Sequence, residues 1–576
     1  AERLMGRENY LCTRRTVSFI IGRADDDHEM ALALALSVAL CDGGIVASLP
    51  ELPDCVNPAS LTAPPRCSMN ACRYAGSCPL IKARKRARQA GILLVNHALV
   101  MTDYRQGGTV LGPYKRVIFD EAHHLERSVM ENLSVRASGD DVERILEPVW
   151  PIKKDQERWK FLLNELEACD PSIDRVGFLE GLSQSAMTLR EAFVGIFRSI
   201  QSSLNPDGEL ANMKTRYLDG EETFADEREN IRGFLLNSNM FTELLKPILE
   251  IKVASAVQPF QQELAFLKDE IGALSDGIRF LVTGRDEDSV FWLEWGRDGS
   301  LGKICGSPLK VDRLFADYLE ETCETAVFTS ATLVQGGSFQ YFNERLGLRY
   351  LDRKPVELVA PNAFRYDENC LILLATWLGD PNGKGFGEGV AGVVGRIVQD
   401  TGCSTMVLFT SYRLCFSTAG FLRDHELAGP VLVQGLGESR ETLSEKLRRS
   451  RGGVLLGVAS FWEGVDFPGD ELEILVIPKL PFPVPTEPIV QARSQKLRAL
   501  GEDPFEKLFL PEAILRLRQG VGRLIRRKRD RGVVIILDSR LDRRPYGDRI
   551  LSSMPSRAIR VETIDEISSR SIAWLK

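Results

Sequence analysis

The sequence lacks any long apolar run. Its longest apolar stretch, Met30 to Leu40, is rich in alanine and is too short to cross a lipid bilayer, which takes about 20 consecutive apolar residues. Hydrophobic residues still make up 44% of the 576 residues, which is enough to fill ordinary cores and to build several domains. We therefore expect a soluble, cytoplasmic, multidomain protein that does not contact a membrane.

Histidine is scarce, and the short cysteine pairs typical of zinc knuckles are absent. The chain has 5 histidines and 12 cysteines, and no histidine lies close in sequence to Cys67, Cys72 or Cys78. No C-x2-C pair occurs. Disulfides are not expected in a long chain of intracellular type, so the cysteines indicate metal or redox chemistry.

The N-terminal cysteines have a spacing that suits an iron–sulfur cluster. Cys67, Cys72 and Cys78 place three thiols within twelve residues, and Cys12 follows the apolar pair Tyr10-Leu11, which can anchor it. Four thiolates bind either a [4Fe-4S] cluster or a tetrahedral zinc ion. We favour the cluster; zinc and unrelated free thiols are the alternatives. Two further cysteines compete with Cys12 for the fourth position, namely Cys41 and Cys55.

Basic residues are concentrated in two segments, although the chain as a whole is acidic. The net charge of -7 argues against a uniformly basic coat for nucleic acid. Residues 82–88 (KARKRAR) and 516–531 are nevertheless rich in lysine and arginine. Such patches either follow a phosphate backbone or form ordinary solvated helix faces.

The hydrophobic pattern predicts an α/β protein with two parallel-sheet lobes, the first interrupted by two insertions. Short apolar strands occur near residues 92–95, 116–119, 290–295 and 326–329, and again between 371 and 537, where they alternate with helical stretches. The predicted segments are 1–10 (first lobe), 11–90 (cysteine-rich insertion), 91–126 (first lobe), 127–285 (helical insertion), 286–350 (return to the first lobe) and 351–576 (second lobe).

Two carboxylates follow a predicted buried strand of the first lobe. This strand ends in Asp120-Glu121-Ala122-His123. Hard cations prefer carboxylate oxygens, and a second carboxylate can orient or deprotonate an attacking water. His123 would relay between this site and the rest of the lobe, and the hydroxyls of Thr329-Ser330 would bridge the acidic motif to the second lobe. A helix N-terminus enriched in acidic residues is the alternative explanation.

The second lobe carries a complementary set. Gln519, Arg523 and Arg526 are spaced to lie on one face of a predicted helix, and guanidinium groups stabilise the charge that develops on a transferring phosphoryl group. After another apolar strand, Gly464 permits close approach of the backbone to a ligand, and Asp466 would pair with the arginines or with a nucleotide ribose. Together the two sets suggest a two-lobed motor that hydrolyses nucleotides.

One part of such a motor is absent from the sequence. No G-x-x-x-x-G-K-[ST] loop, which would cradle the phosphates, occurs in the chain. Gly383-Lys384-Gly385 lacks both the hydroxyl residue and the first glycine of that pattern, so we interpret it as a surface turn. We expect the chain to be an N-terminally shortened form whose phosphate loop lies upstream.

The order of these motifs resembles that of the iron–sulfur superfamily 2 DNA helicases, the XPD/DinG family, and more closely its bacterial DinG branch. The resemblance covers nearly the whole chain. It implies two RecA-like lobes, with a cluster domain and a helical arch inserted in the first. It also implies ATP-driven 5'-to-3' translocation on single-stranded DNA and unwinding of forked duplexes by a monomer, in DNA repair or replication. The motifs are 6–12 (GRENYLC), the three cysteines, 95–97 (VNH), the DEAH box at 120–123, 329–332 (TSAT), 462–466 (WEGVD) and 519–526 (QGVGRLIR).

Carried over residue by residue, the resemblance assigns Asp120 to Mg2+ and Glu121 to the attacking water. Arg523 and Arg526 would reach the γ-phosphate of ATP, and Gln519 would couple them. The residues that match the cluster ligands are Cys12, Cys67, Cys72 and Cys78. A non-motor iron–sulfur protein that binds DNA or senses redox state is one alternative, which an upstream Gly-Lys-Ser/Thr loop would disfavour. An RNA helicase is the other, and the cluster disfavours it.

Overall fold

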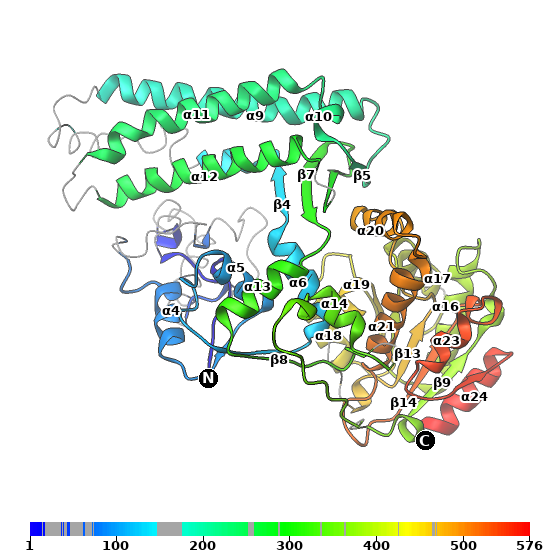
Figure 1. Cartoon of the computed structure of the whole chain (residues 1–576). Helices are drawn as coiled ribbons and strands as arrows, with labels where there is room; N and C mark the ends of the chain where they lie inside the picture. The colour runs from blue at the N-terminus through cyan, green and yellow to red at the C-terminus, as the bar shows by residue number, and fades with distance from the viewer. Residues whose placement is uncertain are drawn as a thin grey trace, which may run out of the picture. The chain divides into compact units, whose positions relative to one another are not determined.

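The chain folds into two compact units. The computed structural model describes residues 1–13, 15–17, 36, 39, 43–46, 61–63, 72, 74–146, 167, 175–251, 258–285, 288–334, 337–361, 364–423, 425–462, 467 and 469–576. The first unit comprises Ala1–Ala331 and Tyr341–Lys354, and the second comprises Thr332–Gln340 and Pro355–Lys576 (Figure 1). No helix within these described ranges is both long enough and apolar enough to span a membrane.

The second unit is built on a seven-stranded parallel sheet with the strand order β11-β12-β10-β13-β14-β9-β15. The apolar segments predicted as strands between residues 371 and 537 all lie in this sheet. Successive side chains of a strand point to opposite faces, so Ile372 and Leu374 enter one core while Leu371 and Leu373 enter the other. The strands are β9 (Cys370–Leu374), β10 (Thr405–Leu408), β11 (Val431–Val433), β12 (Val454–Gly457), β13 (Ile474–Ile477), β14 (Gly532–Ile536) and β15 (Ala558–Arg560).

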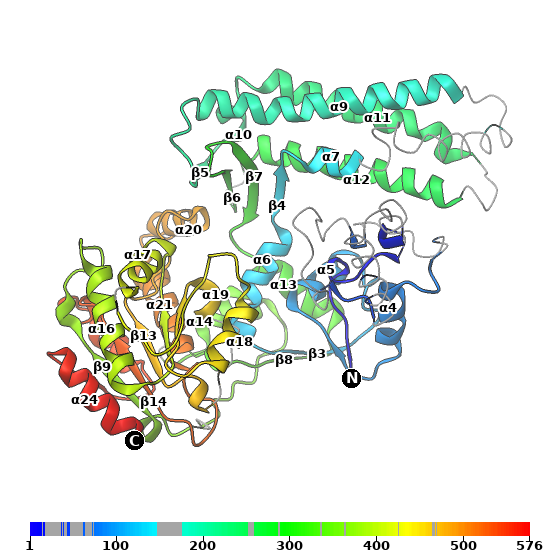
Figure 2. The same ribbon diagram turned by 180° about the vertical axis from the view of Figure 1, so that it is seen from behind.

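Helices cover both faces of this sheet, as Figures 1 and 2 show from opposite sides. One layer contains α16 (Phe386–Thr401), α17 (Tyr412–Leu422) and α24 (Ile564–Leu575). The other contains α18 (Arg440–Arg449), α21 (Leu510–Val521), α22 (Arg540–Arg543) and α23 (Gly547–Ser552). Polar residues set the helix ends: the hydroxyls of Ser411 and Ser439 accept from the backbone N–H three residues later at α17 and α18. The predicted doubly covered parallel sheet is confirmed for this lobe.

The first unit contains two short parallel strand pairs. β1 (Glu2–Arg3) pairs with β2 (Leu93–Leu94), and β3 (Arg116–Phe119) pairs with β8 (Thr325–Phe328), although about 200 residues separate β3 from β8 in the chain. One face of the second pair is packed: Phe119 is buried against Phe315, Tyr318 and Phe328. The helices of this part are α4 (Pro79–Gln89), α5 (His97–Arg105), α6 (Leu125–Leu133) and α13 (Asp312–Thr322).

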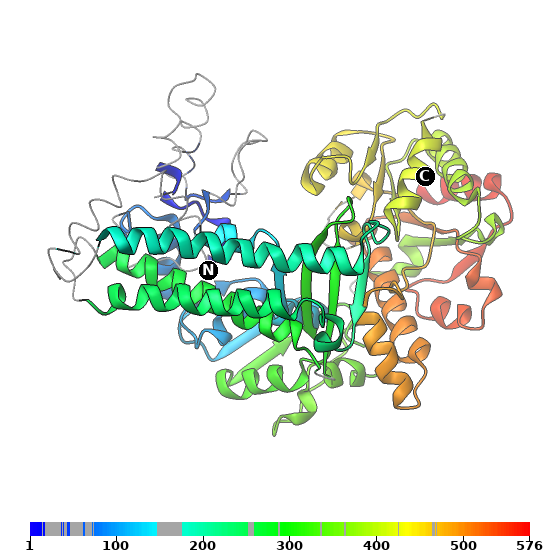
Figure 3. The same cartoon turned by 90° about the horizontal axis from the view of Figure 1, so that it is seen from above.

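The helical insertion combines long helices with a small antiparallel sheet. α9 (Arg175–Leu204), α11 (Arg228–Glu250) and α12 (Gln258–Val282) run side by side (Figure 3). Leu245, Ile248, Leu264, Leu267 and Ile271 are buried in their common core. The sheet has the order β4-β7-β6-β5, from β4 (Val135–Ser138), β5 (Lys214–Tyr217), β6 (Ser289–Trp295) and β7 (Leu301–Pro308).

This sheet moves one expected boundary. From the sequence we expected the chain to return to the first lobe at residue 286, with a strand of that lobe at Val290–Trp295. β6 and β7 instead pair with β4 and β5, and Phe291, Leu293 and Ile304 share the core of the insertion helices. The chain re-enters the parallel ladder only at β8. An apolar strand pattern specifies burial but not the partner strand, which explains the difference.

Candidate functional site

The acidic motif lies directly after β3, at the end of the parallel β3–β8 pair. Phe119 closes the strand, and its carbonyl accepts from the backbone N–H of Thr329 at 2.9 Å. Asp120 Oδ1 accepts from the backbone N–H of Glu121 and from Oγ1 of Thr329, both at 3.0 Å. Its Oδ2 accepts no hydrogen bond from the described residues, and the side chain is exposed. Thr329 therefore orients the carboxylate through Oδ1.

Glu121 has a strained backbone at this point. Its φ of 47° lies in the left-handed region, where among the described residues other than glycine only Asn212 joins it. Such strain costs on the order of 1–3 kcal/mol and persists when the surroundings hold it. Here the next residue, Ala122, is buried and donates its backbone N–H to the carbonyl of Thr329 at 3.0 Å. The turn directs Glu121 and His123 to the same side.

His123 and Ser330 complete this cluster. Nδ1 of His123 lies 2.7 Å from Oγ of Ser330 and 3.3 Å from Oε2 of Glu121, and Ser330 Oγ donates to the same Oε2 at 3.5 Å. The His123 side chain is only 8% exposed, whereas that of Glu121 is 57% exposed. The structure thus brings together the expected residues Asp120, Glu121 and His123 with both hydroxyls. The hydroxyls of Thr329 and Ser330 donate to the side chains of Asp120 and Glu121, so these contacts lie within the first unit.

A further member of this site is His97, which falls in the 95–97 motif but for which the sequence predicted no role. Nε2 of His97 donates to the carbonyl oxygen of Asp120 at 2.9 Å, and its ring packs edge-on against Phe119. Burial lowers the pKa of His97, which favours the neutral ring. His97 is the first residue of α5, capped by the side chain of Asn96, which accepts from Leu99 N at 2.8 Å. A polar pair after the apolar run 92–95 was the available signal.

The second unit does not place Gln519, Arg523 and Arg526 on one helical face, so that prediction is wrong. Helix α21 ends at Val521 with Gly522 as its cap, and two tight turns follow, from Arg523 N to Gly520 O and from Leu524 N to Val521 O. Gly520 and Gly522 lower the helix propensity of this segment. Leu524 and Ile525 are consecutive and both buried, an arrangement that one face of a helix does not provide. Only Gln519 lies on α21.

The residues of this segment still have distinct environments. Gln519 is 9% exposed, and neither its Oε1 nor its Nε2 has a hydrogen-bond partner among the described residues. Nε of Arg523 donates to the carbonyl oxygen of Trp462 at 3.3 Å. Asp530 holds the turn around Arg526, because its Oδ2 accepts from Arg526 N at 2.9 Å. Gly464 and Asp466, the other predicted binding residues, lie outside the described residues.

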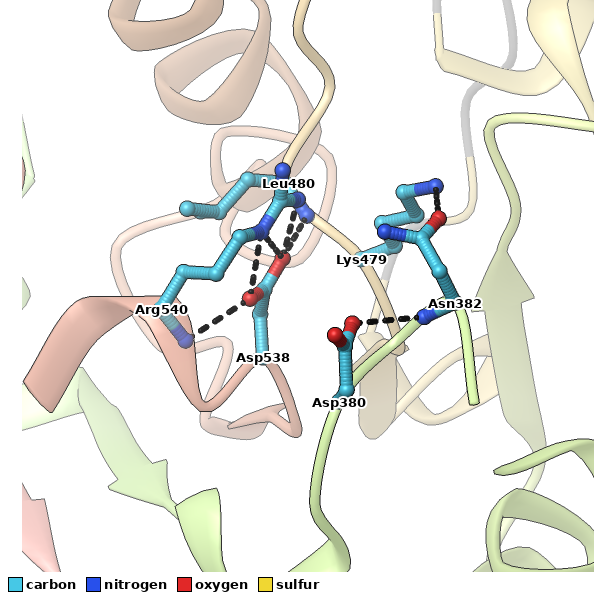
Figure 4. A network of polar contacts seen from close by, with 6 residues as sticks. All are labelled: Asp380, Asn382, Lys479, Leu480, Asp538 and Arg540. Atoms are coloured by element: carbon cyan, nitrogen blue, oxygen red, sulfur yellow. Dashed lines mark hydrogen bonds and ion pairs between the residues drawn. The ribbon is translucent and has the colours of Figure 1, made fainter. Parts of the chain in front are cut away.

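A further polar network joins three strand ends of the second unit (Figure 4). Asp538, after β14, is fully buried and accepts from Leu480 N at 2.7 Å and from Nε of Arg540 at 2.9 Å. Lys479, after β13, donates to Oδ1 of Asn382 at 2.6 Å, and burial lowers the pKa of Lys479. Sequence reasoning missed this network; a carboxylate two residues before an arginine at a strand end was its only signal. The carboxyl ends of parallel strands meet at one edge, which is where ligands bind in such sheets.

Three of the predicted cluster ligands fall among the described residues. Cys12 and Cys78 are buried and Cys72 is half-buried, and all three are free thiols. Burial raises the pKa of Cys78 above its usual range. Cys67, Cys41 and Cys55 lie outside the described residues. Within the part that is described, no group of three or more His, Cys, Asp or Glu residues is arranged to bind a metal ion.

Comparisons with known proteins agree with this architecture. Residues 394–557 match the family described as the helicase C-terminal domain. The chain is 28% identical to the ATP-dependent DNA helicase YoaA of Escherichia coli K12, over 96% of the chain and 81% of that protein. It is also 28% identical to the 3'-5' exonuclease DinG of Bacillus subtilis, over 85% of the chain, but spans only about half (54%) of that relative.

A solved XPD helicase structure has the same fold. It superposes with a TM-score of 0.51 at 14% sequence identity, covering 84% of this chain and 75% of the other. The acidic motif after β3, the RecA-like parallel sheet of the second unit, the helicase C-terminal match and the similarity to DinG and YoaA all agree. Residues 394–557 therefore belong to the helicase C-terminal domain family, and the chain as a whole is similar to the helicases of the XPD/DinG family.

Proposed function

We propose that this chain forms the motor core of an ATP-dependent DNA helicase. The observation that carries the proposal is the arrangement after β3 and β8, where Asp120 is exposed with one oxygen that accepts no hydrogen bond from the described residues, and Glu121 lies beside His123 and Ser330. Hard divalent cations take carboxylate oxygens, which suits Asp120 to Mg2+, an ion that neutralises charge on phosphate oxygens. Glu121 would orient the attacking water, and His123 and Ser330 would hold that carboxylate in place.

The remaining roles follow from the family. Arg523 and Arg526 would stabilise the charge on the γ-phosphate, and Gln519 would couple them to the rest of the lobe; its buried amide without a described partner supports a polar contact made only with ligand present. Gly464 and Asp466 would approach the nucleotide. The substrates would be single-stranded and forked DNA, with 5'-to-3' translocation by a monomer, in repair or replication. Relatives named as DNA helicases support this substrate class.

The phosphate loop would come from a segment outside this chain, which we propose precedes it in the whole protein. In support, the outer face of the β3–β8 pair is apolar and open among the described residues: Ile118 is 72% exposed and its register partner Val327 is 45% exposed. Buried parallel sheets are covered on both faces. A strand followed by a helix, the form in which a phosphate loop occurs, would cover this face.

We also propose that Cys12, Cys67, Cys72 and Cys78 bind a [4Fe-4S] cluster. Soft thiolates are the donors that such clusters require, and Cys12, Cys72 and Cys78 are free thiols in the described part of the chain. The bound cluster would act as a structural staple for a segment with few predicted elements. Within this chain, the backbone of Cys12 donates to Leu61 O at 2.8 Å and so ties the first ligand to the insertion.

The test is ATP hydrolysis by a whole protein that contains the phosphate loop. Glu121→Gln should bind ATP and DNA but hydrolyse slowly, because the amide keeps the shape and loses the carboxylate that handles water. Arg523→Ala and Arg526→Ala should each slow turnover by on the order of 10³-fold if they contact the γ-phosphate. Glu131→Gln, an exposed carboxylate paired with Arg127 on α6, is the matched control and should be unaffected.

The 576-residue chain alone should hydrolyse no ATP, since it offers no cradle for the β- and γ-phosphates. DNA-stimulated hydrolysis by this chain, abolished by Glu121→Gln, would disprove the need for an upstream loop. Normal hydrolysis by Glu121→Gln in the whole protein would disprove the proposed site.

A further inference from the structure

Two exposed aromatic rings lie together on α17 of the second unit. Tyr412 is 46% exposed and Phe416 is 41% exposed, and they are four residues apart, so they share one helix face. Their ring centroids are 5.7 Å apart with an interplanar angle of 33°. Scattered exposed apolar residues are normal on a protein surface, but a pair of rings held against each other forms a continuous platform. We call Tyr412 and Phe416 the aromatic pair.

A glycine loop packs directly against the aromatic pair. Gly435 has a φ of 99°, and a Cβ at this position would lie 2.9 Å from Cε1 of Tyr412 and 3.1 Å from Cζ of Phe416. Only glycine therefore fits. The next residue, Leu436, is 61% exposed, and Gly437 also has a positive φ. The loop supports the rings from one side while their remaining surface stays open to solvent.

The loop is anchored at its base. The side chain of Gln434 donates from Nε2 to Oγ of Ser460 and accepts from the backbone N–H of Val458, both at 2.7 Å. Its own backbone N–H donates to Leu456 O at 3.0 Å. Gln434 thus ties the end of β11 to the end of β12, and the platform is held on the rigid sheet.

The aromatic pair lies at the carboxyl edge of the sheet. Tyr412 follows β10, the Gly435 loop follows β11, and Ser460 follows β12, and these three parallel strands are neighbours in the order β11-β12-β10. The segment after β12 is the start of the predicted motif at 462–466, and Trp462 Nε1 donates to Phe409 O, the residue after β10, at 2.9 Å. The platform is therefore continuous with loops of the motor lobe that carry ligand-binding motifs.

The charge around the platform favours a polyanion. Helix α17 has no acidic residue, and its Arg413 is exposed and has no partner among the described residues. The carboxylates of the neighbouring loop and of α18 each pair with a cation: Glu438 with Lys446, Glu441 with Arg440 and Glu445 with Arg449. Aromatic side chains stack on nucleobases, and a nearby cation follows the phosphate backbone.

We propose that the aromatic pair is a base-stacking site for single-stranded DNA, with Arg413 beside it for the backbone. The proposal rests on the proposed function and assigns a contact point for the strand on the second unit. A base stacks on the open faces of Tyr412 and Phe416 beside Leu436. The site reads no sequence, because every base has an aromatic face.

The test is binding of a fluorescein-labelled oligothymidylate to the full chain, measured by anisotropy, beside an abasic oligonucleotide of the same length. The wild-type chain should prefer the thymidylate. Tyr412→Ala and Phe416→Ala should each weaken thymidylate binding by about 5- to 100-fold and bind the abasic strand as the wild type does. Tyr412→Trp keeps an aromatic face and should retain both affinities. Phe421→Ala is the matched control, since Phe421 lies on the same helix and is 39% exposed.

The outcomes separate the two proposals. A wild-type chain that binds neither strand would overturn the proposed function. A wild-type chain that binds both strands equally, or alanine variants that keep the preference for thymidylate, would overturn the stacking site and leave the proposed function standing. If Tyr412→Ala weakened binding to both oligonucleotides and Tyr412→Trp did not restore it, the stacking proposal would also be overturned, because the substitution would then act through the fold.

Discussion

Replacing Asp538 by asparagine should destabilise the second unit more than replacing an exposed acidic residue of that unit. Asp538 is fully buried, and its carboxylate accepts from Leu480 N at 2.7 Å, Arg540 N at 3.0 Å and the Arg540 guanidinium at 2.5 Å and 2.9 Å. Asparagine has the same shape but turns one acceptor into a donor, which would face another donor. The substitution also leaves the Arg540 charge beside a neutral group.

The magnitude follows from burial. Removing one partner of a buried ion pair costs about 3–5 kcal/mol. The Arg540 side chain is 23% exposed, so solvent screens part of its charge. We therefore expect D538N to lower the free energy of unfolding of the second unit by about 2–4 kcal/mol. Asp542→Asn is the control: Asp542 is 30% exposed and pairs with Arg560, which is 61% exposed, at 2.9 Å, so its loss should cost less than about 1 kcal/mol.

Hydrogen exchange measured by mass spectrometry suits a chain of two units, because it reports on peptides of β13 and β14 separately from the first unit. These peptides should lose protection in D538N and keep it in D542N. The double variant D538N/R540M should be less destabilised than the sum of the single variants, by about 1 kcal/mol or more, since the two side chains are in contact. Equal protection in D538N and D542N would refute the reasoning.

Three further outcomes are expected. Anaerobically purified chain should be brown with about four irons per molecule, and Cys72→Ser or Cys78→Ser should lose the iron while Cys403→Ser keeps it; stoichiometric zinc without visible absorption would contradict the cluster. Neutralising the four cations of residues 82–86 on α4 should flatten the salt dependence of single-strand binding, whose log–log slope is about -0.7 per phosphate contacted, and an unchanged slope would make them a solvated face. Burial raises the pKa of Cys370 and Cys415 to about 12, so at pH 8 only about one thiol in 10⁴ is a thiolate and iodoacetamide should label neither site before unfolding, as peptide mass spectrometry can check.

The parallel sheet of the second unit and the acidic motif were both predictable from local patterns. Runs such as Leu371 to Leu374 are apolar at every position, which is typical of strands buried on both faces, and each becomes a strand. Polar residues at the ends of such strands gather at one edge by topology alone. That rule brought Asp120 and Glu121 together with Thr329 and Ser330 across about 200 residues of chain.

Other features depended on contacts between distant segments. Spacing placed Arg523 and Arg526 on a helix with Gln519, but burial of Leu524 and Ile525 after two glycines ends α21 at Val521. Helical spacing predicts a shared face only for residues that are all in one helix. Whether the helix continues depends on the free energy of burying side chains against the sheet, which competes with helix propensity.

The strand partners and the polar networks were decided by tertiary structure in the same way. The apolar pattern of β6 suits a parallel or an antiparallel neighbour equally, and packing against α9, α11 and α12 selects β5 and β7. The contacts of His97, Asp538 and Gly435 could not be predicted from the sequence, because each residue contacts a partner about 20 to 60 residues away in the chain. The local sequence determines which side chains are buried and which strands end in polar, potentially catalytic residues. Which of these strand ends lie next to each other depends on packing between distant segments, which has no local sequence signal.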